Sequence, residues 1–167
     1  MEQAFGSSFT VGIEEELLLV DPETNLLAPR STEVLAALDL PEGAAAHEAY
    51  AAQVELRSPP SLGAGEAGAA LRMARAAARE AGATLMGAGL HPADDDGDSP
   101  LVDAERYRRV ARMMRGLFAR TPEAALHVHV GMPDAETAIR AFNGLRAHLP
   151  LLQGLGANSP WWFGPPP

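Results

Sequence analysis

The sequence predicts an α+β fold in which helices pack on one face of a mostly antiparallel sheet. Short apolar segments bounded by turn residues alternate with longer segments rich in alanine, arginine and glutamate. The first two apolar segments are not joined by a long crossover helix, which favours antiparallel pairing. The length of 167 residues fits a single domain spanning residues 1–167. The sheet face without helices would be open to a ligand.

Four strands are expected, because four apolar segments are each followed by residues typical of turns or helix starts. In chain order they are Phe9–Val20, Ala51–Ser58, Thr84–Leu90 and Ala125–Met132. Asp21-Pro22 closes the first strand and Pro59-Pro60 closes the second. The fourth strand alternates histidine with valine, the pattern of a strand whose two faces differ.

Helices are expected between and after these strands. They comprise Ser31–Leu38, Gly65–Ala81, a helix after Asp103 with Tyr107, Val110, Met114, Leu117 and Phe118 on its apolar stripe, Pro133 to about His148, and Leu151–Leu155. Ser31 and Asp103 are suited to cap the first and third helices. Gly82 is suited to end the second, and Pro133 to occupy the first turn of the fourth.

Composition excludes several classes of function. The formal net charge of −9 argues against nucleic-acid binding, which needs clustered lysine and arginine. The absence of cysteine excludes disulfides and thiolate chemistry, so any metal would be held by carboxylates and imidazoles. No apolar segment approaches the roughly 20 residues of a membrane-spanning helix. The N-terminal residues do not resemble a signal peptide, and we expect a cytoplasmic protein that binds small molecules.

Acidic residues in the first strand are the first candidates for chemistry. Glu14 and Glu16 share one face of the strand and Glu15 lies on the other. The apolar run Leu17–Val20 follows directly, which indicates a core strand. Two carboxylates on one face of such a strand repel each other unless a cation neutralises them, and Mg²⁺ or Mn²⁺ suits oxygen ligands. A solvated sheet face is the equally open alternative.

The second strand repeats this pattern. Gln53, Glu55 and Arg57 share a face, while the intervening Val54 and Leu56 face the core. If the two strands pair, Glu55 converges with the first pair of glutamates on one or two metal ions. Arg57 would then lie beside them as a clamp for phosphate or carboxylate, or would form a cross-strand salt bridge to a glutamate.

The fourth strand adds two histidines. His127 and His129 lie on one face at a spacing common among metal ligands, although such a pair is more often an exposed polar face. Two other features of the sequence are not interpreted as functional sites. The acidic loop Asp94–Asp98 lacks the spacing of a calcium-binding loop, and Trp161 and Trp162 are interpreted as core or interface aromatics.

Five segments together resemble the carboxylate–amine ligase branch of the glutamate–cysteine ligase superfamily. They are Thr10–Glu16, Gln53–Leu56, His127–Gly131, Leu149–Leu152 and Ala157–Pro160, and they occur in the order found in that family. The resemblance covers about Phe9 to Gly164 and corresponds to the N-terminal half of such a ligase.

The resemblance implies a partial glutamine-synthetase-like catalytic fold. It also implies that Glu14, Glu16 and Glu55 bind Mg²⁺ and that a histidine lines the site, with His127 ahead of His129. The implied reaction uses ATP to activate the γ-carboxylate of glutamate, or a similar acid, as an acyl phosphate. An amine such as cysteine then displaces phosphate. Arg57 would stabilise charge on the phosphate.

Two alternatives are open from sequence. A shortened relative could bind metal or form a homodimer without catalysis, because the edge of a half-sheet can pair with a second copy. An unrelated two-metal hydrolase would also use acids and histidines on strands.

Overall fold

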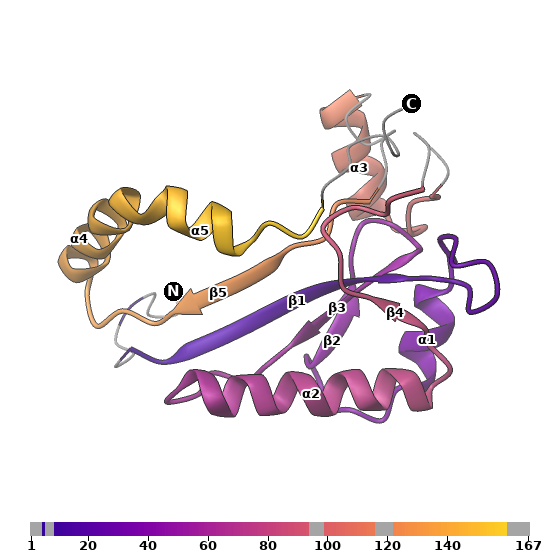
Figure 1. Cartoon of the computed structure of the whole chain (residues 1–167), viewed down its shortest axis with the longest axis horizontal. Helices are drawn as coiled ribbons and strands as arrows, with labels where there is room; N and C mark the ends of the chain where they lie inside the picture. Colours follow the sequence, from indigo (N-terminus) through magenta and orange to yellow (C-terminus); the bar gives the residue numbers. More distant parts are fainter. Residues whose placement is uncertain (1–4, 6–8, 94–98, 116–121, 160–167) are drawn as a thin grey trace.

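A computed structural model describes residues 5, 9–93, 99–115 and 122–159 of the chain (Figure 1). The expected acidic loop Asp94–Asp98 and four aromatic or apolar residues discussed above lie outside the described residues. These four are Leu117, Phe118, Trp161 and Trp162.

A five-stranded antiparallel sheet forms the centre of the fold. Its strands are β1 (Val11–Leu19), β2 (Ala45–His47), β3 (Gln53–Arg57), β4 (Leu85–Met86) and β5 (Leu126–Val130). The order is β2-β3-β1, and both β4 and β5 pair with the remaining edge of β1. β1 is therefore the central strand, and every pairing between these strands is antiparallel, as the sequence predicted.

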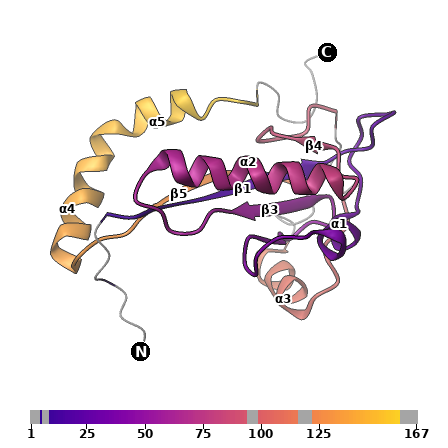
Figure 2. The same cartoon turned by 90° about the horizontal axis from the view of Figure 1, so that it is seen from below.

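Helices cover one face of β1 and β3. They are α1 (Ser31–Ala37) and α2 (Ala64–Glu80) (Figures 1 and 2), while α3 (Glu105–Met114) lies on the opposite side of β1 from α2 (Figure 1). α4 (Ala135–Leu145), the 3-10 helix η2 (Arg146–His148) and α5 (Leu149–Leu155) follow β5. These last helices form an arm on the far side of β5 from α2 (Figure 1).

The main core lies between α2 and the sheet. β1 contributes Leu17 and Leu19, β3 contributes Val54 and Leu56, and α2 contributes Leu71 among small alanines. Each fully buried leucine or valine stabilises the fold by about 1.5–3 kcal/mol relative to exposure. Alanines on α2 allow the helix to approach the sheet closely, so the apolar side chains of β1 and β3 pack directly against it.

Two expected helix caps are wrong. Arg30, not Ser31, occupies the N-cap of α1, and Ser31 is buried as the first helical residue. Its hydroxyl lies 3.3 Å from Nδ1 of His47, so a tertiary contact takes the place of capping. Asp103 does not cap α3 either. Its carboxylate pairs with Arg108, and Ala104 is the N-cap.

The strand and proline expectations also need correction. The sequence did not predict β2, which has only three residues and pairs with β3. The expected strand Thr84–Leu90 is reduced to the two residues of β4, because it pairs only with the end of β1. Pro133 lies before α4 rather than in its first turn, since Asp134 is the N-cap and accepts a hydrogen bond from the Thr137 N–H.

The end of α2 agrees with the sequence. Gly82 adopts a φ of 84°, in the left-handed region that favours glycine, and follows the helix by two residues. Among the described residues, each helix is too short or too polar to cross a membrane.

Candidate metal centre

The alternation along β1 divides three adjacent glutamates between the two faces of the sheet. Glu15 points to the helical face, where Arg75 of α2 donates two hydrogen bonds to it at 2.5 and 2.6 Å. This ion pair raises the pKa of Arg75 through hydrogen bonding to Glu15. Glu14 and Glu16 point to the opposite face, which carries the candidate metal centre.

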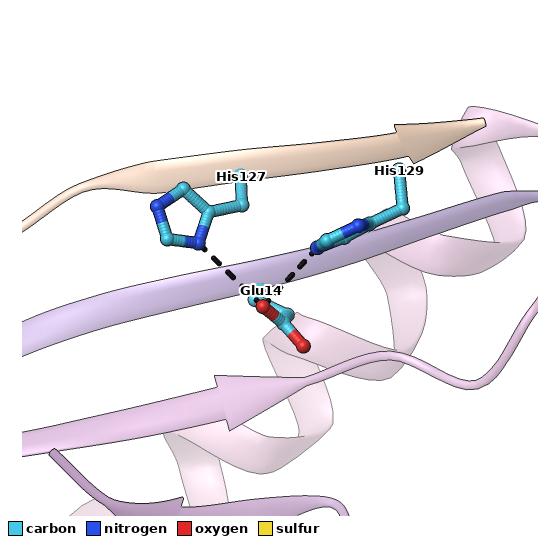
Figure 3. A group of neighbouring side chains, drawn as sticks. All are labelled: Glu14, His127 and His129. Atoms are coloured by element: carbon cyan, nitrogen blue, oxygen red, sulfur yellow. Dashed lines mark hydrogen bonds and ion pairs between the residues drawn. The ribbon is translucent and has the colours of Figure 1, made fainter.

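β5 brings both histidines to Glu14. Glu14 is directly opposite His127, and Gly12 is opposite His129. Nε2 of His129 lies 3.1 Å from Oε2 of Glu14, and Nδ1 of His127 lies 3.5 Å from the same oxygen (Figure 3). Both rings therefore converge on one carboxylate from a single neighbouring strand.

β3 supplies a third carboxylate on the other side of β1. Glu55 is directly opposite Glu16, and its side chain is only 6% exposed. Arg57, two residues further along the same face, forms an ion pair with Glu55 and lies 3.6 Å from Oε1 of Glu14. The expected cross-strand salt bridge of Arg57 to a glutamate is therefore present, through Glu14 on β1, beside an ion pair with Glu55 on its own strand.

These side chains form two groups of possible metal ligands. One contains Glu14, His127 and His129, and the other contains Glu16, Glu55 and His127, with ligand atoms within 4.8 Å of one another in each group. Two ligands of one small divalent ion are at most about 4.4 Å apart, because each lies about 2.0–2.2 Å from the metal. Small side-chain movements would therefore suffice. His127 belongs to both groups. When His127 binds an ion in one group, the other group therefore has only its two remaining protein ligands.

The two carboxylates on β1 have opposite electrostatic environments. Burial raises the pKa of Glu16, and the nearby carboxylates of Glu48 and Glu55 raise it further, against a hydrogen bond from the Ala125 N–H that lowers it. For Glu14, burial also acts to raise the pKa, but hydrogen bonds and charge from His129 outweigh it, and the net pKa is lowered. A cation beside Glu16 would offset both the burial and the repulsion that raise its pKa.

Two supporting residues were not identified from sequence. The sequence placed Gln53 on the same strand face as Glu55 but suggested no role for it. In the structure Gln53 is fully buried, and its side-chain amide donates a hydrogen bond to Oε2 of Glu16 at 3.3 Å. Arg75 was one of three arginines on a predicted helix. The signal for Gln53 was its position on the same face as Glu55, whereas nothing local distinguishes Arg75 from the neighbouring Arg72.

Two cavities adjoin the candidate metal centre. The larger, of about 610 Å³, is mostly apolar and reaches Glu14, Arg57 and His129 at one end of β1. The smaller, of about 500 Å³, is lined by Glu16 and by a segment that includes Asn158 and Ser159. Asn158 and Ser159 are anchored by hydrogen bonds, to the Gly87 carbonyl at 2.7 Å and from the Leu90 N–H at 2.8 Å. Small molecules therefore have space beside both ligand groups.

An antiparallel sheet with carboxylates and imidazoles gathered on its open face defines a class of candidate metal-dependent enzymes. The sequence profile described as Glutamate-cysteine ligase family 2 (GCS2) matches residues 10–166, and the chain belongs to this family. Members of the family have a glutamine-synthetase-like fold, and the α+β architecture described above agrees with it.

Several curated proteins are similar to the chain. A putative glutamate–cysteine ligase 2-3 of Rubrobacter xylanophilus is 42% identical over 98% of this chain and 47% of its own length. The glutamate–cysteine ligase of Halobacterium salinarum is 37% identical over 97% of this chain and 47% of its own. A putative glutamate–cysteine ligase 2 of Roseiflexus castenholzii is 36% identical over 93% of this chain and 42% of its own length. The chain thus spans less than half the length of these relatives.

Proposed function

We propose that this chain is the N-terminal portion of the catalytic domain of an ATP-dependent carboxylate–amine ligase of the glutamate–cysteine ligase type. The observation that carries the proposal is the meeting of two three-residue ligand groups on one sheet face, in a chain of this family. Its proposed substrates are glutamate, or a similar acid, and an amine such as cysteine, as named for its relatives. Because the reaction consumes ATP, we place it in the cytoplasm.

The donor set fits Mg²⁺ or Mn²⁺. Carboxylate oxygens predominate in the group of Glu16 and Glu55, and these hard ligands suit both ions. The group with two imidazoles favours Mn²⁺ over Mg²⁺, because imidazole suits the transition metals better. Bound there, such ions would neutralise phosphoryl oxygens during transfer.

The proposed reaction has two steps. An oxygen of the substrate γ-carboxylate attacks the terminal phosphorus of ATP, forming an acyl phosphate and releasing ADP. The amine nitrogen then attacks the acyl carbon, phosphate leaves with the bonding electron pair, and the nitrogen loses a proton to give the amide. The glutamates serve as ligands rather than as general bases, and their placement on a packed sheet keeps them in position.

Arg57 is the residue that we propose to stabilise charge on the transferred phosphate. It lies beside Glu14 and Glu55 at the edge of the larger cavity, and its side chain is 39% exposed. Its guanidinium pairs with the carboxylates of Glu14 and Glu55. Contact with phosphate therefore requires that metal ions bind these two carboxylates and release the guanidinium. Arg57→Ala in the complete enzyme should lower kcat, and unchanged turnover would refute this role.

Metal binding is the direct test of the centre. We expect the chain to bind Mn²⁺, measured by loss of the free-ion signal in electron paramagnetic resonance. Glu55→Gln and His127→Asn should weaken binding by at least tenfold, the usual size of a lost ligand or its support. Glu80→Gln and His148→Asn make the same changes at exposed positions outside both groups, and they should leave binding unchanged.

Nucleotide binding separates the ligase from its alternatives. In calorimetry, Mg²⁺-dependent binding of ATP would support the ligase, and hydroxylamine should trap the acyl phosphate formed by the complete enzyme. Metal binding without nucleotide would favour a two-metal hydrolase or a non-catalytic relative. If neither metal nor nucleotide binds, the proposed function is wrong for this chain.

A further inference from the structure

We propose that Gln53 is a positioning residue that holds Glu16 and the start of β5 in one arrangement for metal binding. The inference rests on the proposed metal centre, but it concerns a residue that is not itself in either ligand group. It is drawn from the hydrogen bonds of a single fully buried amide.

The amide of Gln53 links three segments of the chain. From β3, its Nε2 donates to Oε2 of Glu16 on β1 at 3.3 Å and to the carbonyl of Glu123 at 2.8 Å. Two residues further on, the N–H of Ala125 donates to the same oxygen of Glu16 at 2.8 Å. His127 follows two residues later on β5. One amide on β3 thus joins the Glu16 carboxylate of β1 to the segment that leads into β5, the strand that carries the histidines.

The chemistry of the contacts fixes the orientation of this amide. Both partners of Nε2, a carboxylate oxygen and a backbone carbonyl, can only accept hydrogen bonds when Glu16 is ionised. Rotation of the amide by 180° would place Oε1 against two acceptors. The NH₂ group of Gln53 must therefore face Glu16 and Glu123.

This orientation leaves Oε1 of Gln53 buried without a hydrogen-bond partner in the part of the chain that the structure describes. A buried acceptor without a partner lowers stability, whereas an apolar side chain of similar size would not carry that cost. The unpaired acceptor thus offsets what the two donated hydrogen bonds contribute to stability. The amide is well suited to holding Glu16, because a neutral donor fixes the carboxylate and leaves the negative charge available to a cation.

The inference predicts a small effect on stability and a large effect on metal binding. Gln53→Met keeps the length of the side chain but removes both donors and the unpaired acceptor. We expect its urea midpoint to stay close to that of the unmodified chain, because loss of the unpaired acceptor offsets loss of the two donated hydrogen bonds. Its Mn²⁺ affinity should fall by about tenfold, as is typical when a residue supporting a metal ligand is lost.

Gln153→Met is the matched control, because Gln153 is exposed on α5. It should change neither the midpoint nor the Mn²⁺ affinity. A double-variant cycle then tests whether Gln53 acts through Glu16. In the background of Glu16→Gln, which removes the charge that Gln53 holds, Gln53→Met should have no further effect on Mn²⁺ affinity.

Three results would overturn the inference. Unchanged Mn²⁺ affinity in Gln53→Met would show that Glu16 is positioned without the amide, while the metal centre itself would stand. A loss of affinity together with a lower urea midpoint would show a structural role. Absence of Mn²⁺ binding in the unmodified chain would overturn the metal centre, and this inference with it.

A measurement on the unmodified chain keeps the test decisive if Gln53→Met does not fold. In nuclear magnetic resonance spectra, the side-chain amide protons of Gln53 should exchange slowly with water, because both are donated within the protein. Small amounts of Mn²⁺ should broaden them strongly, and the Gln153 amide should be unaffected. Fast exchange without selective broadening would contradict the proposal.

Discussion

Two leucines lie at the same level of the sheet, on opposite sides of Glu15, and have opposite environments. Leu56 of β3 and Leu126 of β5 are each directly opposite Glu15, so both face the helical side of the sheet. Leu56 is 0% exposed and Leu126 is 61% exposed. The difference arises because α2 packs on β1 and β3, whereas β5 lies on the far side of β1 from α2 (Figure 1).

The same division runs through the candidate metal centre. Glu14, Glu16 and Glu55 belong to the packed strands, whereas His127 and His129 lie on β5, whose five residues are all exposed. The helices α4, η2 and α5, which follow β5, contain no buried residue either. Three of the five candidate ligands therefore lie on strands held by a core, and the other two are held mainly by pairing of β5 with β1.

The largest expected effect tests this contrast with one substitution at two positions. Leu56→Ala removes buried apolar volume and should lower the free energy of unfolding by about 2–5 kcal/mol. Leu126→Ala on the exposed strand should lower it by less than about 0.5 kcal/mol. Urea denaturation of both variants measures the difference.

A large cost for Leu126→Ala that depends on protein concentration would contradict the contrast. It would show that β5 is covered in solution by a second copy of the chain. Such a result would support the homodimer expected from sequence, which otherwise stays a prediction.

A smaller effect is expected from the ion pair beneath the centre. Arg75→Met leaves the mostly buried Glu15 on the apolar side of β1 without its two hydrogen bonds. Hydrogen bonds to charged groups contribute about 1.5–3 kcal/mol, so we expect a loss of about 2 kcal/mol. Because the charge left unpaired causes this loss, the double variant Glu15→Leu with Arg75→Met should recover most of it. Thermal unfolding of both variants is the measurement, and an additive loss in the double variant would refute the explanation.

Much of this arrangement was predictable because alternation in a strand is a local property. Glu14 and Glu16 share a face, and Glu55 joins them once the strands pair, so the sequence was sufficient to group them. The positions of His127 and His129 beside Glu14 depend on the register of β5, which a pattern of alternating residues does not specify.

Other features could not be predicted because long-range contacts determine them. The three residues of β2 form a strand only because they pair with β3. Ser31 does not cap α1, because its hydroxyl contacts His47. The exposure of Leu126 could not be predicted from the sequence either. Leu126, Val128 and Val130 share one face of β5, and such an apolar face is also typical of a strand that packs on a core. In each case the deciding partner is distant along the chain.

The smallest expected effect lies in the arm itself and is local. The N–H and hydroxyl of Thr137 donate to the Asp134 carboxylate at the start of α4, at 2.7 and 3.0 Å, and they lower its pKa. A lowered pKa means that the carboxylate stabilises the folded helix end at neutral pH, and that this contribution is lost as pH falls through the folded-state value. Asp134→Ala should therefore fray the first turn of α4 at neutral pH, as measured by Cα chemical shifts, with little further change on acidification. Asp134→Asn retains a capping oxygen that does not titrate, so its first turn should be intact at neutral pH and insensitive to acid.

Because no residue of α4 is buried, the effect should not spread to β1 or α2. If their shifts also changed, the arm would be coupled to the packed half of the molecule, and the contrast between the two leucines would not extend to the helices that follow β5.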